Sequence, residues 1–241
     1  PSYSVGENCY KEIPYVTRKF GTRAVVIGGK TAMSKAKPEL EAAIKDSDVE
    51  ILDYIWYGGD SSYENVEMLK NNPLVTGADM LFGVGGGRAC DTVKTLADML
   101  DKPFFTFPTL ASNCAACTAI TVMYNPDGSF KEYYYMHGPS YHTFINTKII
   151  ADSPERLLWA GIGDALSKEC EVLYAGRDKF MYHTPLMGQC IAKICTTPLI
   201  EYGAKALEAC RSNKPDFALE QVALDIIIST GIVSNLSLIH I

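Results

Sequence analysis

Residues 78–100 read ADMLFGVGGGRACDTVKTLADML, and this stretch decides the class of fold. Ala78 to Val84 are almost all apolar, as is typical of a strand that helices cover on both faces. Gly85, Gly86 and Gly87 follow, and a helical pattern then continues to about Leu100. A buried strand that meets a helix through glycines predicts a close approach of the backbone to a ligand at the helix N-terminus.

Strands and helices alternate on both sides of this stretch. Three further strands are expected at residues 23–27, 49–54 and 104–108, with helices between them. This spacing predicts an α/β fold with a parallel, doubly wound, Rossmann-like sheet. A hairpin is expected from two strands, 118–124 and 131–136, that flank the turn Asn125-Pro126-Asp127-Gly128.

A last strand is expected at Thr143 to Asn146, and from residue 151 onward the pattern is helical. We therefore place a domain boundary near residue 150. Residues 1–150 are predicted to form a dinucleotide-binding domain, and residues 151–241 an all-helical metal and substrate domain. The chain starts with Pro1 instead of Met and ends on Ser237–Ile241 directly after a helical run, so we expect the second domain to be truncated.

Composition and charge narrow the classes of partner. Of the 241 residues, 47% are hydrophobic and 21% charged, which is typical of a globular protein with a sizeable core. The net charge of −6 argues against nucleic acid and anionic membrane as partners. No apolar run approaches the roughly 20 residues that span a bilayer.

The chain has eight cysteines, scattered through apolar surroundings. This pattern predicts free, mostly buried thiols in a reducing cytoplasm and not a disulfide framework. Cys114 and Cys117 form a C-x-x-C, but a zinc site of this kind needs a second pair or suitably spaced histidines.

Three segments carry the candidate chemistry. In residues 84–94, the glycines and the following helix suit a pyrophosphate, with Asp91 and Lys94 on one helix face; a plain strand-to-helix turn is the alternative. Residues 108–118 leave the carboxyl end of a strand with small hydroxyl side chains that suit phosphate and ribose, although any polar loop could look alike. Asp164 is a candidate metal ligand, or an acid near a helix start that pairs with Lys168.

Together, these three segments resemble the glycerol dehydrogenase branch of the iron-containing, or group III, alcohol dehydrogenases. The resemblance extends to about Asn235 and implies the two-domain architecture that dehydroquinate synthases share. It implies a metal-dependent, NAD(P)-linked oxidoreductase that acts on the CH–OH group of a small polyol, and a complete protein that is a homo-oligomer. A 3-dehydroquinate synthase-like enzyme and a truncated, inactive nucleotide-binding fragment are the alternatives.

The predicted site follows from the residues and from this resemblance. Predicted cofactor contacts, from the pyrophosphate to the nicotinamide, are Gly85, Gly86, Gly87, Arg88, Asp91, Thr109, Ser112, Thr118, Ile120 and Tyr124. Asp164 matches the catalytic carboxylate that holds a divalent metal with two histidines; zinc is expected, with iron as the alternative. The two histidines should lie beyond Ile241, because His137, His142, His183 and His240 do not match. We expect His137, His142 and His183 on the surface.

Two departures from the family pattern bear on specificity. Glycerol dehydrogenases carry an acid after the first strand, which holds the ribose 2′-OH, whereas this chain has Gly28-Gly29-Lys30. Lys30 offers a cation to a 2′-phosphate, so we expect NADP to be accepted besides NAD. Where the family has an aspartate that contacts glycerol, this chain has Cys114. At this position the chain resembles the hydroxycarboxylate dehydrogenases. That change predicts a 2-hydroxy or 2-oxo acid as an alternative substrate.

Overall fold

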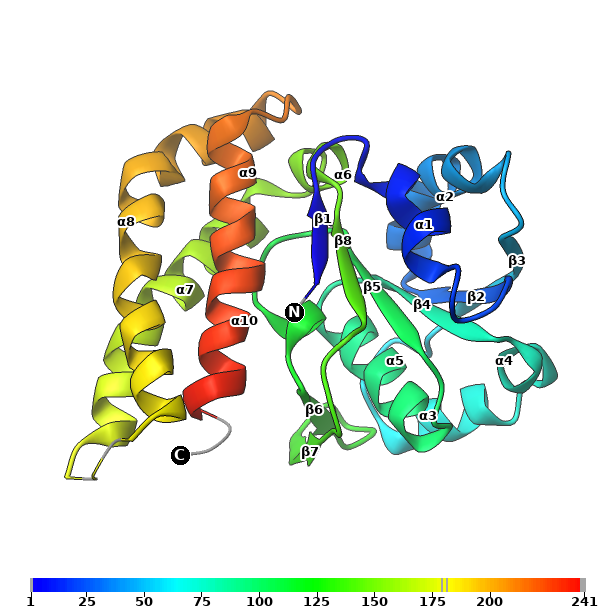
Figure 1. Cartoon of the computed structure of the whole chain (residues 1–241), viewed down its shortest axis with the longest axis horizontal. Coiled ribbons are helices and arrows are strands. Elements are labelled where there is room, and N and C mark those ends of the chain that lie inside the picture. Colours follow the sequence, from blue (N-terminus) through cyan, green and yellow to red (C-terminus); the bar gives the residue numbers. More distant parts are fainter. Residues whose placement is uncertain (1, 179, 181, 239–241) are drawn as a thin grey trace.

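The computed structural model describes residues 2–178, 180 and 182–238, and Figure 1 shows a sheet flanked by helices beside a separate group of long helices. The sheet has six strands, all parallel, in the order β1-β8-β5-β4-β2-β3. Their bounds are β1 (Tyr3–Val5), β2 (Arg23–Gly28), β3 (Glu50–Trp56), β4 (Met80–Gly85), β5 (Phe104–Pro108) and β8 (His142–Ile145). The predicted doubly wound parallel sheet is confirmed.

Helices cover both faces of this sheet. One face carries η1 (Cys9–Glu12), α1 (Ile13–Thr17) and α2 (Lys30–Ile44), and the other carries α3 (Tyr63–Lys70), α4 (Pro73–Gly77) and α5 (Gly87–Met99). Alternate residues of β2 point to opposite faces of the sheet. Val26 packs on the face that carries α1 and α2, and Val25 on the face that carries α3, α4 and α5. Because β4 lies between β2 and β5, all six of its residues are buried, which explains its nearly unbroken apolar sequence.

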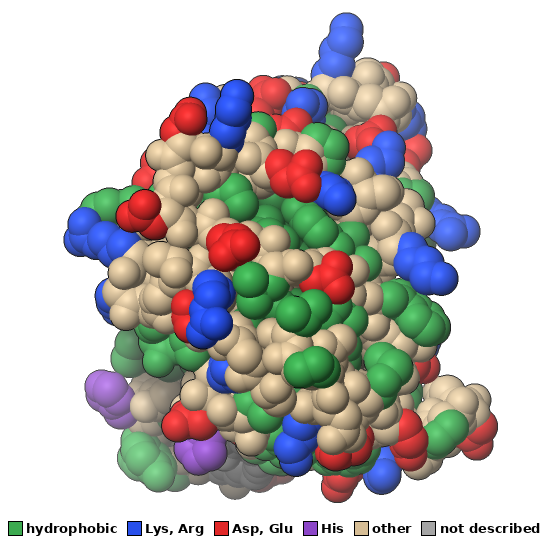
Figure 2. Space-filling view, turned by 90° about the vertical axis from the view of Figure 1, so that its right-hand side faces the viewer, with side chains coloured by type: hydrophobic (Ala, Val, Ile, Leu, Met, Phe, Trp, Pro, Cys, Tyr) green, Lys and Arg blue, Asp and Glu red, His purple; other side chains and the backbone are tan. Residues whose placement is uncertain are grey.

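Charged side chains of both signs are interspersed over the face of the molecule formed by α2, β3 and α4 (Figure 2). Neither sign dominates this face. The expectation that nucleic acid is not a partner remains a prediction.

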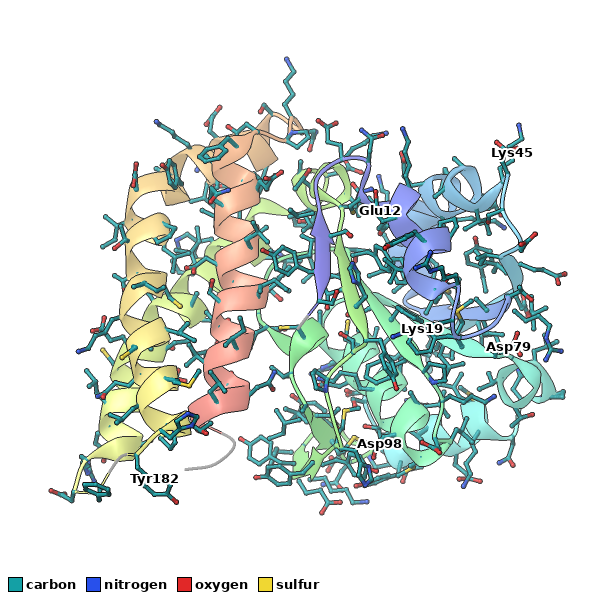
Figure 3. The ribbon with its side chains drawn as sticks, in the orientation of Figure 1. Glu12, Lys19, Lys45, Asp79, Asp98 and Tyr182 are labelled. Carbon is teal, nitrogen blue, oxygen red and sulfur yellow. The ribbon has the colours of Figure 1, made fainter. Side chains whose placement is uncertain are left out.

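The predicted hairpin is confirmed and consists of β6 (Ile120–Tyr124) and β7 (Phe130–Tyr135), which pair antiparallel. Asp98 joins the hairpin region to the C-terminal part of α5 (Figure 3), where its Oδ2 accepts a 2.7 Å hydrogen bond from the Tyr134 hydroxyl. The same carboxylate accepts hydrogen bonds from the backbone N–H and the Nδ1 of His137. The hairpin is therefore attached to the helix that begins at the triple glycine.

All elements described after Ile145 are helical, and a 3₁₀ turn, η2 (Ala115–Cys117), lies in the loop after β5. The helices are α6 (Thr147–Ala151), α7 (Glu155–Gly176), α8 (Thr184–Arg211), α9 (Phe217–Leu224), η3 (Asp225–Ser229), α10 (Thr230–Val233) and η4 (Ser234–Leu238). The last four form one long helix beside α7 and α8 (Figure 1), in which η3 and η4 are π-helical. The predicted all-helical second region is confirmed, while the boundary at residue 150 remains a prediction.

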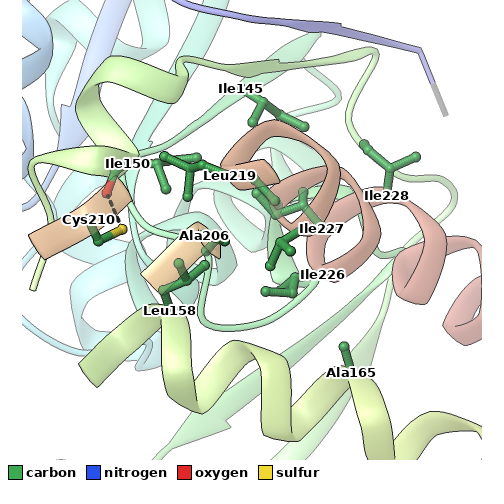
Figure 4. Close-up of a cluster of buried hydrophobic side chains, with 14 of the residues drawn as sticks. Ile145, Ile150, Leu158, Ala165, Ala206, Cys210, Leu219, Ile226, Ile227 and Ile228 are labelled. Atoms are coloured by element: carbon green, nitrogen blue, oxygen red, sulfur yellow. Dashed lines mark hydrogen bonds between the residues drawn. The ribbon is translucent and has the colours of Figure 1, made fainter. Parts of the chain in front are cut away.

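A shared apolar core fixes the helical region against the sheet. Ile226 and Ile227 of the long helix pack in one cluster with Ile145 at the end of β8 and Leu158 of α7 (Figure 4). Gly161 of α7 approaches the loop after β5 so closely that a Cβ there would lie 2.1 Å from the Ala111 carbonyl oxygen. Helix α7 is therefore held directly over the carboxyl edge of the sheet.

The long helix corrects the expectation that no apolar segment is long enough to span a bilayer. Residues Phe217–Leu236 form a helix of 20 residues that is long and apolar enough, by length and composition, to cross a membrane. However, 67% of its most apolar window is buried inside the protein, so a core helix accounts for its composition. Asp225 is buried within it, and burial raises the pKa of this carboxyl to about 6.

Candidate active site

The triple glycine joins the buried strand β4 to α5, as the sequence predicts. Gly85 has a φ of +149°, and a Cβ there would lie 2.8 Å from the Ala89 Cβ, so this turn requires glycine. Gly86 is the N-cap of α5 and Gly87 its first residue. The first turn of a helix leaves N–H groups without partners inside the helix, and these can bind an anion.

A cavity of about 590 Å³ opens over this turn, at the carboxyl ends of β2, β4 and β5. We call it the glycine cavity. Six predicted cofactor residues line it: Gly85, Gly86, Gly87, Arg88, Thr109 and Ser112. The rest of the lining includes Gly29, Thr31, Ala32, Lys35, Tyr57 and residues between Ile149 and Leu157. Its volume is in the range usual for small-molecule sites, and its position is the one at which open α/β sheets bind ligands.

A second cavity of about 420 Å³ lies between the hairpin, the loop after β5 and α7. We call it the Asp164 cavity. Its lining includes most of the remaining predicted site residues, which are Asp91, Cys114, Thr118, Ile120, Tyr124 and Asp164. Gly87 and Arg88 line both cavities, so the two meet at the start of α5.

Arg88 is fixed where the two cavities meet. Its Nη1 lies 3.2 Å from Asp60 Oδ2, and its guanidinium lies 5.0 Å from the centroid of the Tyr124 ring. About half of the Arg88 side chain is exposed, at 54%. The guanidinium can therefore bind an anionic ligand while it keeps its contacts with Asp60 and Tyr124.

Lys94 connects α5 to the wall of the Asp164 cavity. Its side chain is fully buried, and its Nζ donates to the carbonyl oxygens of Ala115 and Ile120, both at 2.7 Å, and to Thr118 Oγ1 at 3.0 Å. The same Nζ lies 2.9 Å from Asp91 Oδ1, and Asp91 Oδ2 accepts from the Val122 backbone N–H at 3.2 Å.

This network orders the loop that carries Cys114 and the first strand of the hairpin. Burial raises the pKa of Asp91, against the opposing effects of the Lys94 charge and the Val122 N–H. Sequence reasoning placed Asp91 and Lys94 on one helix face but missed the role of Lys94. The Asp-x-x-Lys spacing inside an otherwise apolar helix was the available signal.

The alternative interpretation of Asp164, as an acid near a helix start, is wrong, because Asp164 lies nine residues after the start of α7. Its expected pairing with Lys168 is present, with Lys168 Nζ 3.5 Å from Asp164 Oδ1. Lys168 Nζ also donates to Glu171 Oε2 at 2.9 Å. Burial lowers the pKa of Lys168, but the Glu171 hydrogen bond and the Asp164 charge outweigh it, so the net shift of its pKa is upward.

The two cysteines of the C-x-x-C have different surroundings. Cys114 is partly exposed in the Asp164 cavity, and its Sγ lies 3.6 Å from Ser234 Oγ. Cys117 is buried and donates to the Ile227 carbonyl oxygen at 2.8 Å; burial raises the pKa of its thiol to about 12. The eight cysteines are free, and five are buried, as the sequence predicts.

The described residues do not complete a metal site around Asp164. Over residues 2–178, 180 and 182–238, no three His, Cys, Asp or Glu side chains are grouped so that they could hold an ion. His137 and His183 are exposed, as expected, and His240 lies outside the described residues.

The expectation for His142 was wrong. This residue is buried at the start of β8, where its Nδ1 and Nε2 contact Ser2 Oγ and Ser4 Oγ at 2.7 and 2.9 Å. Burial lowers the pKa of His142 to about 4. The reason is β1, an edge strand that sequence reasoning did not find and that brings both serines against the ring.

Lys30 does not line either cavity. It is exposed at the first position of α2, with its Nζ 5.0 Å from the centroid of the Trp56 ring. Its neighbours Gly29 and Thr31 line the glycine cavity, so Lys30 lies at the rim. Lys35 lines the cavity itself and pairs with Asp152 at 2.5 Å.

Known proteins are similar to this chain in sequence. Glycerol dehydrogenase from Escherichia coli O6:H1 is 30% identical over 226 residues, a match that covers 91% of this chain and 61% of that protein. Hydroxycarboxylate dehydrogenase A from Escherichia coli K12 is 35% identical over 154 residues, which covers 63% of this chain and 41% of that protein. The chain therefore spans about 61% of the length of the first relative.

The fold has a close counterpart among solved structures. The crystal structure of glycerol dehydrogenase from Schizosaccharomyces pombe matches with a TM-score of 0.86 at 24% identity. The match covers 98% of this chain and 61% of that one. The sequence pattern of iron-containing alcohol dehydrogenases matches residues 1–142, more than half of this chain. The protein therefore belongs to the iron-containing alcohol dehydrogenase family.

Proposed function

We propose that the complete protein is a metal-dependent, NAD(P)-linked oxidoreductase that acts on the CH–OH group of a small polyol or 2-hydroxy acid. The observation that carries this proposal is the junction of the two cavities at Gly87 and Arg88. A dinucleotide can lay its pyrophosphate over the start of α5 and reach from there into both cavities. The names of the relatives, glycerol dehydrogenase and hydroxycarboxylate dehydrogenase A, support this reaction class.

The residues of this chain have distinct roles in the proposal. The N–H groups at the start of α5 bind the pyrophosphate, because they lack partners inside the helix and form the positive end of its dipole. Thr109 and Ser112 offer hydroxyl groups to the same ligand in the glycine cavity. Ile120 and Tyr124 form a wall of the Asp164 cavity against which the nicotinamide ring packs.

A resident divalent metal is part of this proposal, with zinc as the first candidate and iron as the second. Asp164 is its proposed ligand, and a complete site needs ligands from outside the described residues. We also propose a cytoplasmic homo-oligomer that binds neither nucleic acid nor membranes.

Replacing Asp164 by asparagine in the complete protein tests the function. We expect kcat/KM for glycerol, 1,2-propanediol and lactate to fall by at least about 100-fold, since loss of a metal is worth several kcal/mol of transition-state stabilisation. The Kd of NADH, measured by fluorescence titration, should change less than about threefold, because few of its proposed contacts involve Asp164.

Glu169→Gln is the matched control on the same helix, because Glu169 lines neither cavity. Full activity of Asp164→Asn, or the absence of any dehydrogenase turnover in the unaltered complete protein, would contradict the proposal. The second result, together with intact NADH binding, would favour an inactive nucleotide-binding protein.

Replacing Lys30 by aspartate tests the choice of cofactor. We propose that NADP is accepted, because Lys30 offers an exposed cation at the rim of the glycine cavity. In Lys30→Asp the Kd of NADPH should rise about tenfold while that of NADH changes little, since only the 2′-phosphate would meet the new charge. Aspartate suits the first turn of a helix, so the variant should fold.

Lys37→Asp is the control for this experiment. Lys37 also lies on α2 over an aromatic ring, with its Nζ 4.6 Å from the centroid of Tyr54. Unlike those of Lys30, its two chain neighbours, Ala36 and Pro38, do not line the glycine cavity. Strict use of NAD by the unaltered protein would show that Lys30 has no part in cofactor choice.

A further inference from the structure

We infer that Lys168 makes the Asp164 cavity selective for substrates with a carboxylate beside the reacting carbon, which are 2-hydroxy and 2-oxo acids, over polyols. This inference rests on the proposed dehydrogenase function and names the substrate class of the same cavity. The sequence showed only that Cys114 stands where glycerol dehydrogenases have an acid. A thiol offers no positive partner for a carboxylate, and the structure supplies one.

Lys168 is a buried cation in the cavity wall. Only 8% of the residue is exposed, although it lines the cavity together with Cys114 and Asp164. Lysine is rarely buried to this extent, because desolvation of an ammonium group is unfavourable unless partners compensate for it. A lysine that served only to pair with acids of α7 could do so on the exposed side of the helix.

The contacts of Lys168 leave room for another acceptor. An ammonium group has three N–H donors. Among the described residues, its hydrogen bond is to Glu171 Oε2 at 2.9 Å, and Asp164 Oδ1 at 3.5 Å is beyond ordinary hydrogen-bond distance. A substrate carboxylate in the cavity can therefore accept a charge-assisted hydrogen bond from Nζ without displacing Glu171.

The charges of the lining are paired, and Lys168 is the cation among them with donors left for an anion. Asp91 faces the cavity, but its charge is compensated by the buried Lys94 at 2.9 Å. Arg88 is paired with Asp60 at 3.2 Å, and Asp164 lies 3.5 Å from Lys168. Glu171 is 42% exposed and outside the lining, where solvent screens its charge. An uncharged polyol would not use the charge of Lys168.

A purely structural role for Lys168 makes a different prediction. If its pairs with Asp164 and Glu171 only stabilised α7, the loss of the charge would affect all substrates alike. Lactate and 1,2-propanediol separate the two cases, because they have the same reacting CH–OH group and differ in a carboxylate against a hydroxymethyl group.

The experiment uses the complete protein with both substrates. We expect the unaltered enzyme to prefer lactate in kcat/KM. In Lys168→Met, kcat/KM for lactate should fall about 10- to 100-fold, as expected for a lost charge-assisted hydrogen bond, and that for 1,2-propanediol less than about threefold. Binding of oxamate, an unreactive analogue of a 2-oxo acid, to the NADH complex should weaken by a similar factor in calorimetry.

Three further variants complete the design. Lys168→Arg keeps the charge and should keep the preference for lactate, and Lys205→Met on α8 controls for removal of an exposed lysine. If Lys168→Met does not fold, Lys168→Gln tests the same loss of charge and retains a donor for Glu171.

A preference of the unaltered enzyme for 1,2-propanediol, or an equal loss for both substrates in Lys168→Met, would overturn the inference. Failure of the proposed function has a different signature, which is NADH binding without turnover of either substrate.

Discussion

Substitution of Gly86 by valine should abolish dinucleotide binding in a protein that still folds. Gly86 has a φ of −87° and ψ of −170°, which other residues can adopt, so the backbone itself does not forbid a side chain. A Cβ at this position lies 3.3 Å from the Leu110 side chain, and the two methyl groups of valine would extend over the start of α5. The pyrophosphate needs that space to reach the N–H groups.

We expect the Kd of NADH, measured by fluorescence titration, to rise at least about 100-fold in Gly86→Val. Circular dichroism should show an unchanged helix content. Gly77→Ala is the matched control, because a Cβ at Gly77 meets nothing within 4 Å and should leave the Kd unchanged. If a folded Gly86→Val protein binds NADH as tightly as before, the pyrophosphate does not bind at the triple glycine.

Replacing Lys94 by methionine should cost about 3 to 5 kcal/mol of the free energy of unfolding. The substitution keeps the length of the side chain but leaves Asp91 buried without its cation. It also removes the donor from the carbonyl oxygens of Ala115 and Ile120. Urea unfolding monitored by circular dichroism measures the loss.

The control is Lys70→Met, since Lys70 and Glu67 have the same i,i+3 spacing on an exposed helix face, where such a pair contributes at most about 1 kcal/mol. In the double variant Asp91→Asn with Lys94→Met, the buried charge is gone, and we expect part of the lost stability to return. A loss below about 1 kcal/mol in Lys94→Met would show that Asp91 is neutral or solvated in the folded protein.

The sequence was sufficient for the central strands of the sheet because local and long-range signals agree there. The apolar run of β4 and the glycines after it predict a central strand and a ligand-binding turn, and both are present. The short β1 could not be predicted, because three polar or mixed residues at a sheet edge carry no periodic signal. The error on His142 followed from that, since the pairing of β1 with β8 brings Ser2 and Ser4 against its ring.

The candidate site was predictable in its residue types but not in its electrostatics. Glycines and hydroxyl side chains at strand ends indicate a nucleotide site from spacing alone, and the structure brings them into the glycine cavity. The charge balance of the Asp164 cavity depends on which side of α7 Lys168 takes and on the reach of Lys94 across 26 residues to Ile120. Such contacts arise from tertiary packing, which one sequence does not reveal.

The meeting of the two cavities at Gly87 and Arg88 affects the strength of cofactor binding. A dinucleotide that spans both behaves as two tethered ligands, in which the pyrophosphate is a short linker lying on the start of α5. Once one nucleotide has bound, the effective concentration of the other nucleotide at its own cavity is of millimolar order or higher. The whole cofactor should therefore bind far more tightly than either mononucleotide. That gain depends on the angle between β4 and α5, which the left-handed backbone of Gly85 sets.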